Sequence, residues 1–133
     1  MTDFSNYAEL RTLDFWFNAN SQSTTAPTTV YVSLHTADPG DTGASEASGS
    51  GYARIALSFG AASTATDGTT NISSDADATF AAFSGSFTFT HMGIWDALSS
   101  GNFLAGGALS TSRSVVSGDQ LKFSSGNVTV ALD

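Results

Sequence analysis

The spacing of apolar residues changes early in this chain, and that change constrains the fold more than any other feature. Within residues 5–18, Leu10, Leu13 and Phe17 recur at intervals of three and four, which is the period of an α-helix. From Val30 onward, apolar and polar residues alternate in short runs, which is the period of half-buried β-strands. The sequence therefore predicts one N-terminal helix followed by an all-β region.

The predicted helix has a start signal and a polar segment after it. Ser5 or Asn6 can cap its first turn, and Asn6 followed by Glu9 resembles a capping box. The segment 19–28 is polar and closes with Ala26-Pro27. We therefore expect a helix within residues 1–18, a linker at 19–28 and a β-sandwich domain at 29–133.

Turns rich in Gly, Ser and Asp separate the alternating runs at short intervals, a pattern typical of a β-sandwich or barrel. We expect about eight short strands in a single antiparallel sandwich, for which a jelly roll and an immunoglobulin-like arrangement both remain open. In the run 87–95, alternation predicts that Phe87, Phe89, His91 and Trp95 share one face. The expected strands are 30–35, 52–59, 71–73, 78–83, 87–95, 103–109, 113–116, 120–123 and 128–132.

The charge balance argues against two classes of partner. The formal net charge is -8, and the chain has 12 Asp and Glu but only four Lys and Arg, which are scattered singly. Nucleic acids and anionic membranes both attract clustered cations. The sequence has no Cys and no apolar run long enough for a transmembrane helix. We therefore expect neither nucleic acid nor membrane as a partner.

A search for catalytic motifs finds none. No Gly-x-Ser-x-Gly window exists, and His35 and His91 are isolated on separate predicted strands. Asp96 after Trp95 is the best single candidate for a perturbed acid, but an Asp that initiates a turn explains it better. We expect no enzymatic activity and no cofactor.

The loop between the first two predicted strands gathers acidic residues. Asp38, Asp41 and Glu46 lie in this Gly-rich segment, and loop oxygens are the ligands that calcium prefers. Against a calcium site, Asp in Asp-Pro-Gly already serves as a turn former. Arg54 is the cation nearest to these acids in the sequence, and we expect it to pin the loop 36–51 by a charge-assisted hydrogen bond.

Several segments, taken in order, resemble a family of short phage and prophage virion structural proteins that are described as tail-fibre-like or head-decoration-like. The resemblance implies a non-enzymatic component of the virion, assembled in the host cytoplasm. The segments that carry it are Leu34-His35-Thr36-Ala37-Asp38-Pro39-Gly40, Glu46, Gly51-Tyr52-Ala53-Arg54, His91-Met92-Gly93-Ile94-Trp95-Asp96-Ala97, Ser100-Gly101-Asn102-Phe103-Leu104, Leu109, Gly118-Asp119 and Leu121-Lys122-Phe123.

Two functional hypotheses follow. In the first, the protein is a small head decoration or cement protein that binds other virion proteins through its apolar helix and forms a homo-oligomer, for which a trimer would match the three-fold points of a capsid. In the second, it is a tail-fibre or tail-tip module that binds a host surface glycan. The assembly interface would use Phe4, Tyr7, Leu10, Leu13, Trp16 and Phe17, and the glycan contact would use Tyr31, Tyr52, Trp95 and Asp96.

Overall fold

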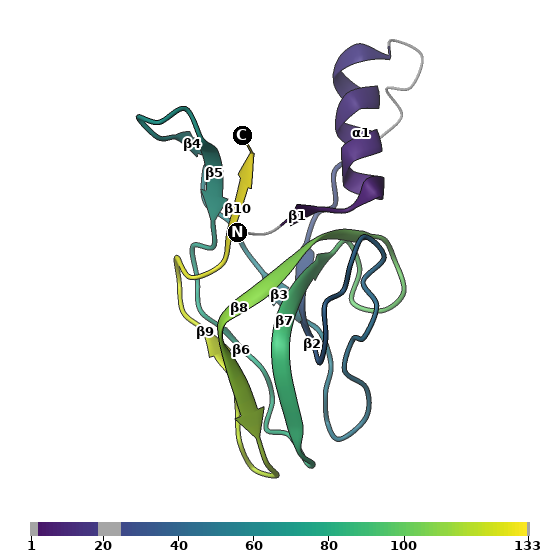
Figure 1. The fold of residues 1–133 in the computed structure, drawn as a ribbon, viewed down its shortest axis with the longest axis vertical. Helices are drawn as coiled ribbons and strands as arrows, with labels where there is room; N and C mark the ends of the chain where they lie inside the picture. Colours follow the sequence, from purple (N-terminus) through teal and green to yellow (C-terminus); the bar gives the residue numbers. More distant parts are fainter. Residues whose placement is uncertain (1–2, 19–24, 133) are drawn as a thin grey trace.

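The computed structural model describes residues 3–18 and 25–132. Within these residues the fold is mainly β, with antiparallel strands and one helix at the N-terminus, which confirms the predicted fold class (Figure 1). The elements are β1 (Asp3–Phe4), α1 (Asn6–Phe17), β2 (Val30–His35), β3 (Ile55–Leu57), β4 (Ser63–Thr64), β5 (Thr70–Ser73), β6 (Ala78–Thr79), β7 (Phe87–Trp95), β8 (Phe103–Val115), β9 (Lys122–Phe123) and β10 (Thr129–Leu132).

The strands form one large sheet and two small ones in a sandwich-like arrangement. The five-stranded sheet has the order β1-β8-β7-β2-β3, and its longest strands, β7 and β8, are antiparallel neighbours. A three-stranded sheet has the order β10-β5-β4, and β6 pairs with β9. Figure 1 shows β8 and β7 as curved strands through the middle of the molecule, with α1 standing beyond one end of them.

Both faces of the five-stranded sheet are covered, which explains why four successive residues of β2 are buried. Val32 and Leu34 are fully buried in the main hydrophobic core, with Met92 as a neighbour on β7. Ser33 and His35 alternate with them and are also fully buried, beneath the long loop 36–51. A strand that is covered on both faces loses the polar alternation that a half-exposed strand shows.

A bulge changes the face assignment predicted for β7. The register with β8 shifts between Phe89 and His91, so alternation restarts after Thr90. As a result Phe89 lies in the main core together with Met92, whereas His91 pairs with His35 on the opposite face, toward the loop. The prediction that Phe87, Phe89, His91 and Trp95 share one face is therefore wrong, because a bulge adds an unpaired residue and reverses the faces beyond it.

Several strand boundaries differ from those expected. The segments 103–109 and 113–116 form a single strand, β8, because the polar residues between them form a bulge rather than a turn. The runs 52–59 and 78–83 keep only the short strands β3 and β6. Two further strands, β1 and β4, carry no alternating pattern, since each is only two residues long.

Helix α1 begins at Asn6 and ends at Phe17, inside the segment 1–18 predicted to contain it. Ser5 is the cap: its hydroxyl accepts a hydrogen bond from Ala8 N at 3.2 Å and donates one to the carbonyl of Phe103. Its backbone N–H donates to Leu104 O at 2.9 Å. The cap therefore fixes the base of the helix to β8. Of the linker predicted at 19–28, residues 19–24 lie outside the described residues.

Candidate functional site

Helix α1 exposes almost all of its apolar side chains. None of its residues is buried. The exposed fraction is 64% for Leu10, 58% for Leu13, 72% for Trp16 and 83% for Phe17. Phe15, which the sequence interpretation did not include in the interface, is 50% exposed. Such a cluster of exposed apolar side chains is typical of an interaction surface.

The other two residues of the expected interface lie elsewhere. Phe4 and Tyr7 are half-buried and line an apolar cleft of about 460 Å³ between α1 and the ends of the sheets. Arg11 also lines this cleft, and its guanidinium lies 5.3 Å from the ring centroid of Tyr7. The structure thus divides the six residues between a wall of this cleft and an exposed helix surface.

Arg54 ties the loop 36–51 and a second turn to the sheet. Its Nε and Nη2 donate to the two carboxylate oxygens of Glu46 at 2.8 and 2.7 Å, a bidentate pair. Its Nη1 donates to Ala97 O at 3.0 Å and to Ser100 O at 2.8 Å. The guanidinium also lies 3.7 Å from the ring centroid of Trp95. One buried side chain therefore joins two loops that are distant in the sequence.

A chain of hydrogen bonds runs beneath the same loop. Trp95 Nε1 donates to Ser33 Oγ at 2.9 Å, Ser33 Oγ is 2.7 Å from His35 Nε2, and His35 Nδ1 is 2.7 Å from Ala44 O. Because a carbonyl can only accept, Nδ1 carries the hydrogen and Nε2 accepts from Ser33. Burial lowers the pKa of His35 below its ordinary value of 6.5. The neutral imidazole is thus the form that this network requires.

Two glycines allow the loop and the sheet to approach closely. A Cβ atom on Gly93 would lie 2.6 Å from Phe103, 2.7 Å from Ser33 and 2.8 Å from His35. A Cβ on Gly43 would lie 2.4 Å from Trp95, and the φ of Gly43 is +75°, a conformation that L-residues rarely adopt. Both positions therefore need glycine.

The three acids considered for calcium do not converge. Asp38 Oδ1 accepts a hydrogen bond from Gly40 N at 2.9 Å, which is a turn contact. Both carboxylate oxygens of Glu46 accept from Arg54, and Tyr52 OH donates to one of them at 2.9 Å. Burial opposes ionisation of Glu46, but these hydrogen bonds outweigh it and lower the pKa of its carboxyl. Among the residues that the structure describes, no group of three or more acidic or histidine side chains could hold a metal ion.

The residues expected to contact a glycan do not form an open surface. Trp95 is 8% exposed, with Arg54 over its ring and Phe103 at 5.1 Å between ring centroids. The hydroxyl of Tyr52 is occupied by Glu46 and by Leu34 N, and burial raises its pKa. Asp96 accepts two hydrogen bonds from Asn102, at 2.7 and 2.8 Å, and so closes a turn. Tyr31, the fourth, is half-buried and pairs with Trp95 across the strands.

The Ser33–His35 contact has the residue types of a nucleophile and a base. Both residues have no exposed surface, and the hydroxyl already bonds to Trp95. A substrate cannot reach this pair, so its role in the structure is to support the loop.

A second hollow, which the sequence did not suggest, lies beside β8. Arg113, Phe123 and Asn127 are among the residues that line it. These residues belong to separate segments that share no motif, so the sequence could not predict that they line one hollow.

In the described part of the chain, no helix is long and apolar enough to cross a membrane. A family model described as "Podophage GP4 fiber I protein gp80" matches residues 3–131. The match therefore includes α1, the three sheets and the loop 36–51. No curated protein matches the sequence.

Proposed function

We propose that this chain, which belongs to the podophage GP4 fiber I protein gp80 family, is a non-enzymatic tail-fibre component that self-associates through α1 and contacts a host surface glycan with its β-sandwich. Family membership makes the chain a structural protein of the virion. The family description favours a fibre over the head decoration that the sequence interpretation put first.

One observation carries the assembly part of the proposal: the apolar stripe of α1 faces away from the sheets. Tyr7, Arg11 and Thr12 line the cleft on the side of the sheets. At 3.6 residues per turn, Leu10, Leu13 and Phe17 fall on the opposite side of the helix. Each of these three side chains is more than half exposed. Burying one of them in an interface contributes roughly 1.5–3 kcal/mol.

The spacing of the residues in this apolar stripe indicates what binds to it. Leu10, Leu13 and Phe17 are separated by three and then four residues, which is the a-d-a spacing of a coiled coil. Helices of other copies of this chain have a matching stripe, so identical helices can pack along it. A 12-residue helix is marginal alone, but the Ser5 cap fixes α1 to β8 and presents the stripe in an ordered form. We therefore expect a homo-oligomer with closed cyclic symmetry, of which a dimer is the smallest and a trimer the next.

The oligomer can be tested with two matched substitutions. Leu13 is 58% exposed on α1, and Leu98 is 56% exposed on a turn of the sandwich. Sedimentation of the purified chain should show a concentration-dependent oligomer. Leu13→Glu should give a monomer with an unchanged circular dichroism spectrum, whereas Leu98→Glu should keep the oligomer. A monomeric wild-type chain, or an oligomer that survives Leu13→Glu, would refute assembly through this stripe.

The location in the virion needs a separate measurement. Immunogold electron microscopy of purified particles, with antibody to this chain, should label the tail. Label spread over the heads would instead support a decoration protein and would overturn the fibre proposal. Absence of label from intact particles, combined with label on isolated host envelopes, would also overturn it.

A further inference from the structure

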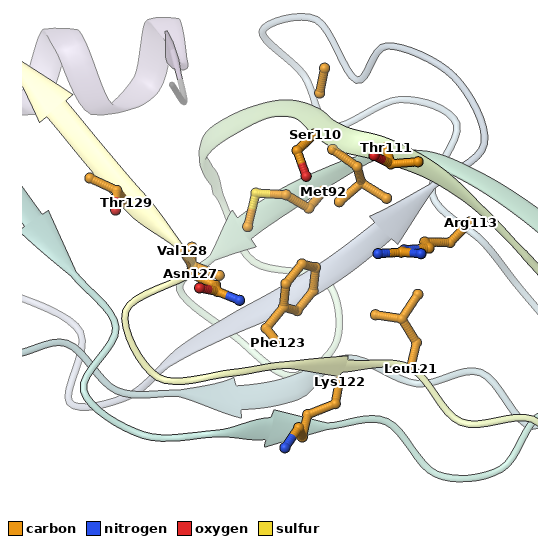
Figure 2. Close-up of a pocket in the computed structure, with 12 residues that line it drawn as sticks. Met92, Ser110, Thr111, Arg113, Leu121, Lys122, Phe123, Asn127, Val128 and Thr129 are labelled. Carbon is orange, nitrogen blue, oxygen red and sulfur yellow. The ribbon is translucent and has the colours of Figure 1, made fainter.

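A groove with a volume of about 560 Å³ opens between β8 and the segment that contains β9 and the start of β10 (Figure 2). This volume lies within the range of small-molecule sites. Its floor is apolar: Met92, Leu121 and Val128 are buried, and Phe123 is half-buried. The rim is polar and is formed by Ser110, Thr111, Arg113, Lys122, Asn127 and Thr129.

The bulge in β8 creates one wall of this groove. Phe89 pairs with Arg113 and His91 pairs with Ala108, so Thr90 alone stands opposite residues 109–112. The bulged residues leave the ladder, and three of them, 109–111, line the groove. Bulges are frequent beside binding sites because they redirect side chains.

Within the residues that the structure describes, Arg113 differs from the other three Lys and Arg side chains in having no ion-pair, hydrogen-bond or ring partner. Arg54 pairs with Glu46 and Lys122 with Asp77, at 2.7 and 3.0 Å, and Arg11 lies over a tyrosine ring. Among the described residues, Arg113 alone of the four makes no ion pair, side-chain hydrogen bond or ring contact. In a chain of net charge -8, this free guanidinium gives the groove a local positive charge.

The polar groups converge on the aromatic ring. In Figure 2 the guanidinium of Arg113 and the side-chain amide of Asn127 point toward Phe123 from opposite sides, while the amine of Lys122 extends away from the groove. An aromatic ring offers its face to the C–H groups of a sugar ring, the amide and the Ser110 and Thr111 hydroxyls can both donate and accept, and a guanidinium binds a carboxylate in bidentate fashion. A polyanion such as nucleic acid would need several free cations, and this groove has one.

We propose that this groove binds an acidic sugar unit of a surface polysaccharide, a hexuronate being the simplest case. The sugar ring lies on Phe123, its carboxylate binds Arg113, and its hydroxyl groups bond to Asn127 and Ser110. The inference rests on the glycan-binding part of the proposed function and moves it from Trp95, whose ring is covered, to this groove. One such subsite binds weakly, with a dissociation constant of order 1 mM, and repetition along a fibre raises the avidity.

The test uses the full chain and a matched pair of probes, trigalacturonic acid and its methyl ester, in a ¹H–¹⁵N NMR titration at low salt. The acid should shift amide signals of residues 108–113 and 121–129, and the ester should bind at least tenfold more weakly. Arg113→Gln should weaken binding of the acid at least tenfold. Arg11→Gln removes the same charge from α1, outside this groove, so it should change binding less than twofold.

Three results would overturn the proposal. The first is an absence of shifts with the acid at a concentration of about 20 mM, well above the expected constant. The second is equal binding of acid and ester. The third is equal weakening by Arg113→Gln and Arg11→Gln, which would indicate general electrostatic attraction rather than a site. Unmoved amide signals outside the groove show that a variant keeps its fold. Because Arg113 is exposed, its substitution should not disturb the core. Failure here leaves the fibre proposal intact, since tail labelling and the Leu13→Glu oligomer test do not involve this groove.

Discussion

Replacing Arg54 with alanine should lower the free energy of unfolding by about 3 kcal/mol, because it breaks a buried ion pair and leaves the acid behind. The side chain of Arg54 is 8% exposed and that of Glu46 is 20% exposed. Removing one partner of a fully buried pair costs about 3–5 kcal/mol, and the residual exposure of Glu46 places this case at the lower end. Arg54→Ala also leaves the carbonyls of Ala97 and Ser100 without their donor.

Urea unfolding followed by circular dichroism measures this loss directly. With a slope of about 2 kcal/mol/M, the midpoint should fall by roughly 1.5 M. Arg113→Ala is the matched control, since Arg113 is exposed, and it should change stability by less than about 0.5 kcal/mol. Arg54→Lys keeps the charge but not the bidentate geometry, so it should lie between wild type and Arg54→Ala.

A double variant distinguishes two contributions to the loss of stability: the unpaired carboxylate of Glu46 and the lost contacts of the Arg54 side chain. Adding Glu46→Gln to Arg54→Ala removes the unpaired carboxylate and should recover part of the lost stability. The pKa of Glu46 is lowered in the folded protein, so the pair stabilises the fold above about pH 4.5 and the stabilisation is lost as pH falls below that value. A loss of less than 1 kcal/mol for Arg54→Ala, or unchanged protease resistance of residues 36–51, would refute the argument that this pair pins the loop.

Two further perturbations test the same region. In the same urea assay, Gly93→Ala should destabilise the fold by about 1–3 kcal/mol, since its Cβ would lie within 2.8 Å of three side chains. Gly60→Ala is the control and should be nearly neutral, because its Cβ would lie 3.7 Å from its nearest neighbour. Because the pKa of His35 is lowered by burial, the unfolded chain binds a proton that the folded protein does not, so stability should fall as pH decreases below about 6.5, by at most about 1.4 kcal/mol per pH unit. His35→Gln should flatten the pH dependence of the urea midpoint between about pH 7 and 5.5. The same slope in wild type and His35→Gln would contradict the assignment of this titration.

Local sequence patterns predicted the class of fold because they depend on neighbouring residues only. The spacing of Leu10, Leu13 and Phe17 indicated the helix, and Ser5 satisfies the open N–H groups of its first turn wherever the helix lies. The alternation of Val30, Val32 and Leu34 similarly indicated a strand. The resemblance to phage structural proteins was also visible in the sequence, and the family match agrees with it.

Features that depend on register were not predictable in this way. The bulge opposite Thr90 reverses the faces of β7, and it arises from the pairing of β7 with β8 rather than from any residue pattern. The same holds for Trp95, for which the sequence allowed either a glycan contact or, from its alternation with Phe87 and Phe89, a place in the core; the structure places it beneath the loop 36–51. Its cover depends on Gly43 and Arg54, which are brought to it by chain folding.

The sequence by itself determined that this chain forms a helix and an antiparallel β-fold with few cations, because periodicity, turn residues and charge are properties of short segments and of composition. Only the tertiary structure decided which of those residues are available for function. It left the stripe on α1 uncovered, it used Arg54 and Trp95 internally, and it brought Arg113, Phe123 and Asn127 to one groove. The physical reason is that exposure and the meeting of distant side chains depend on strand order and register, which contacts between remote segments determine.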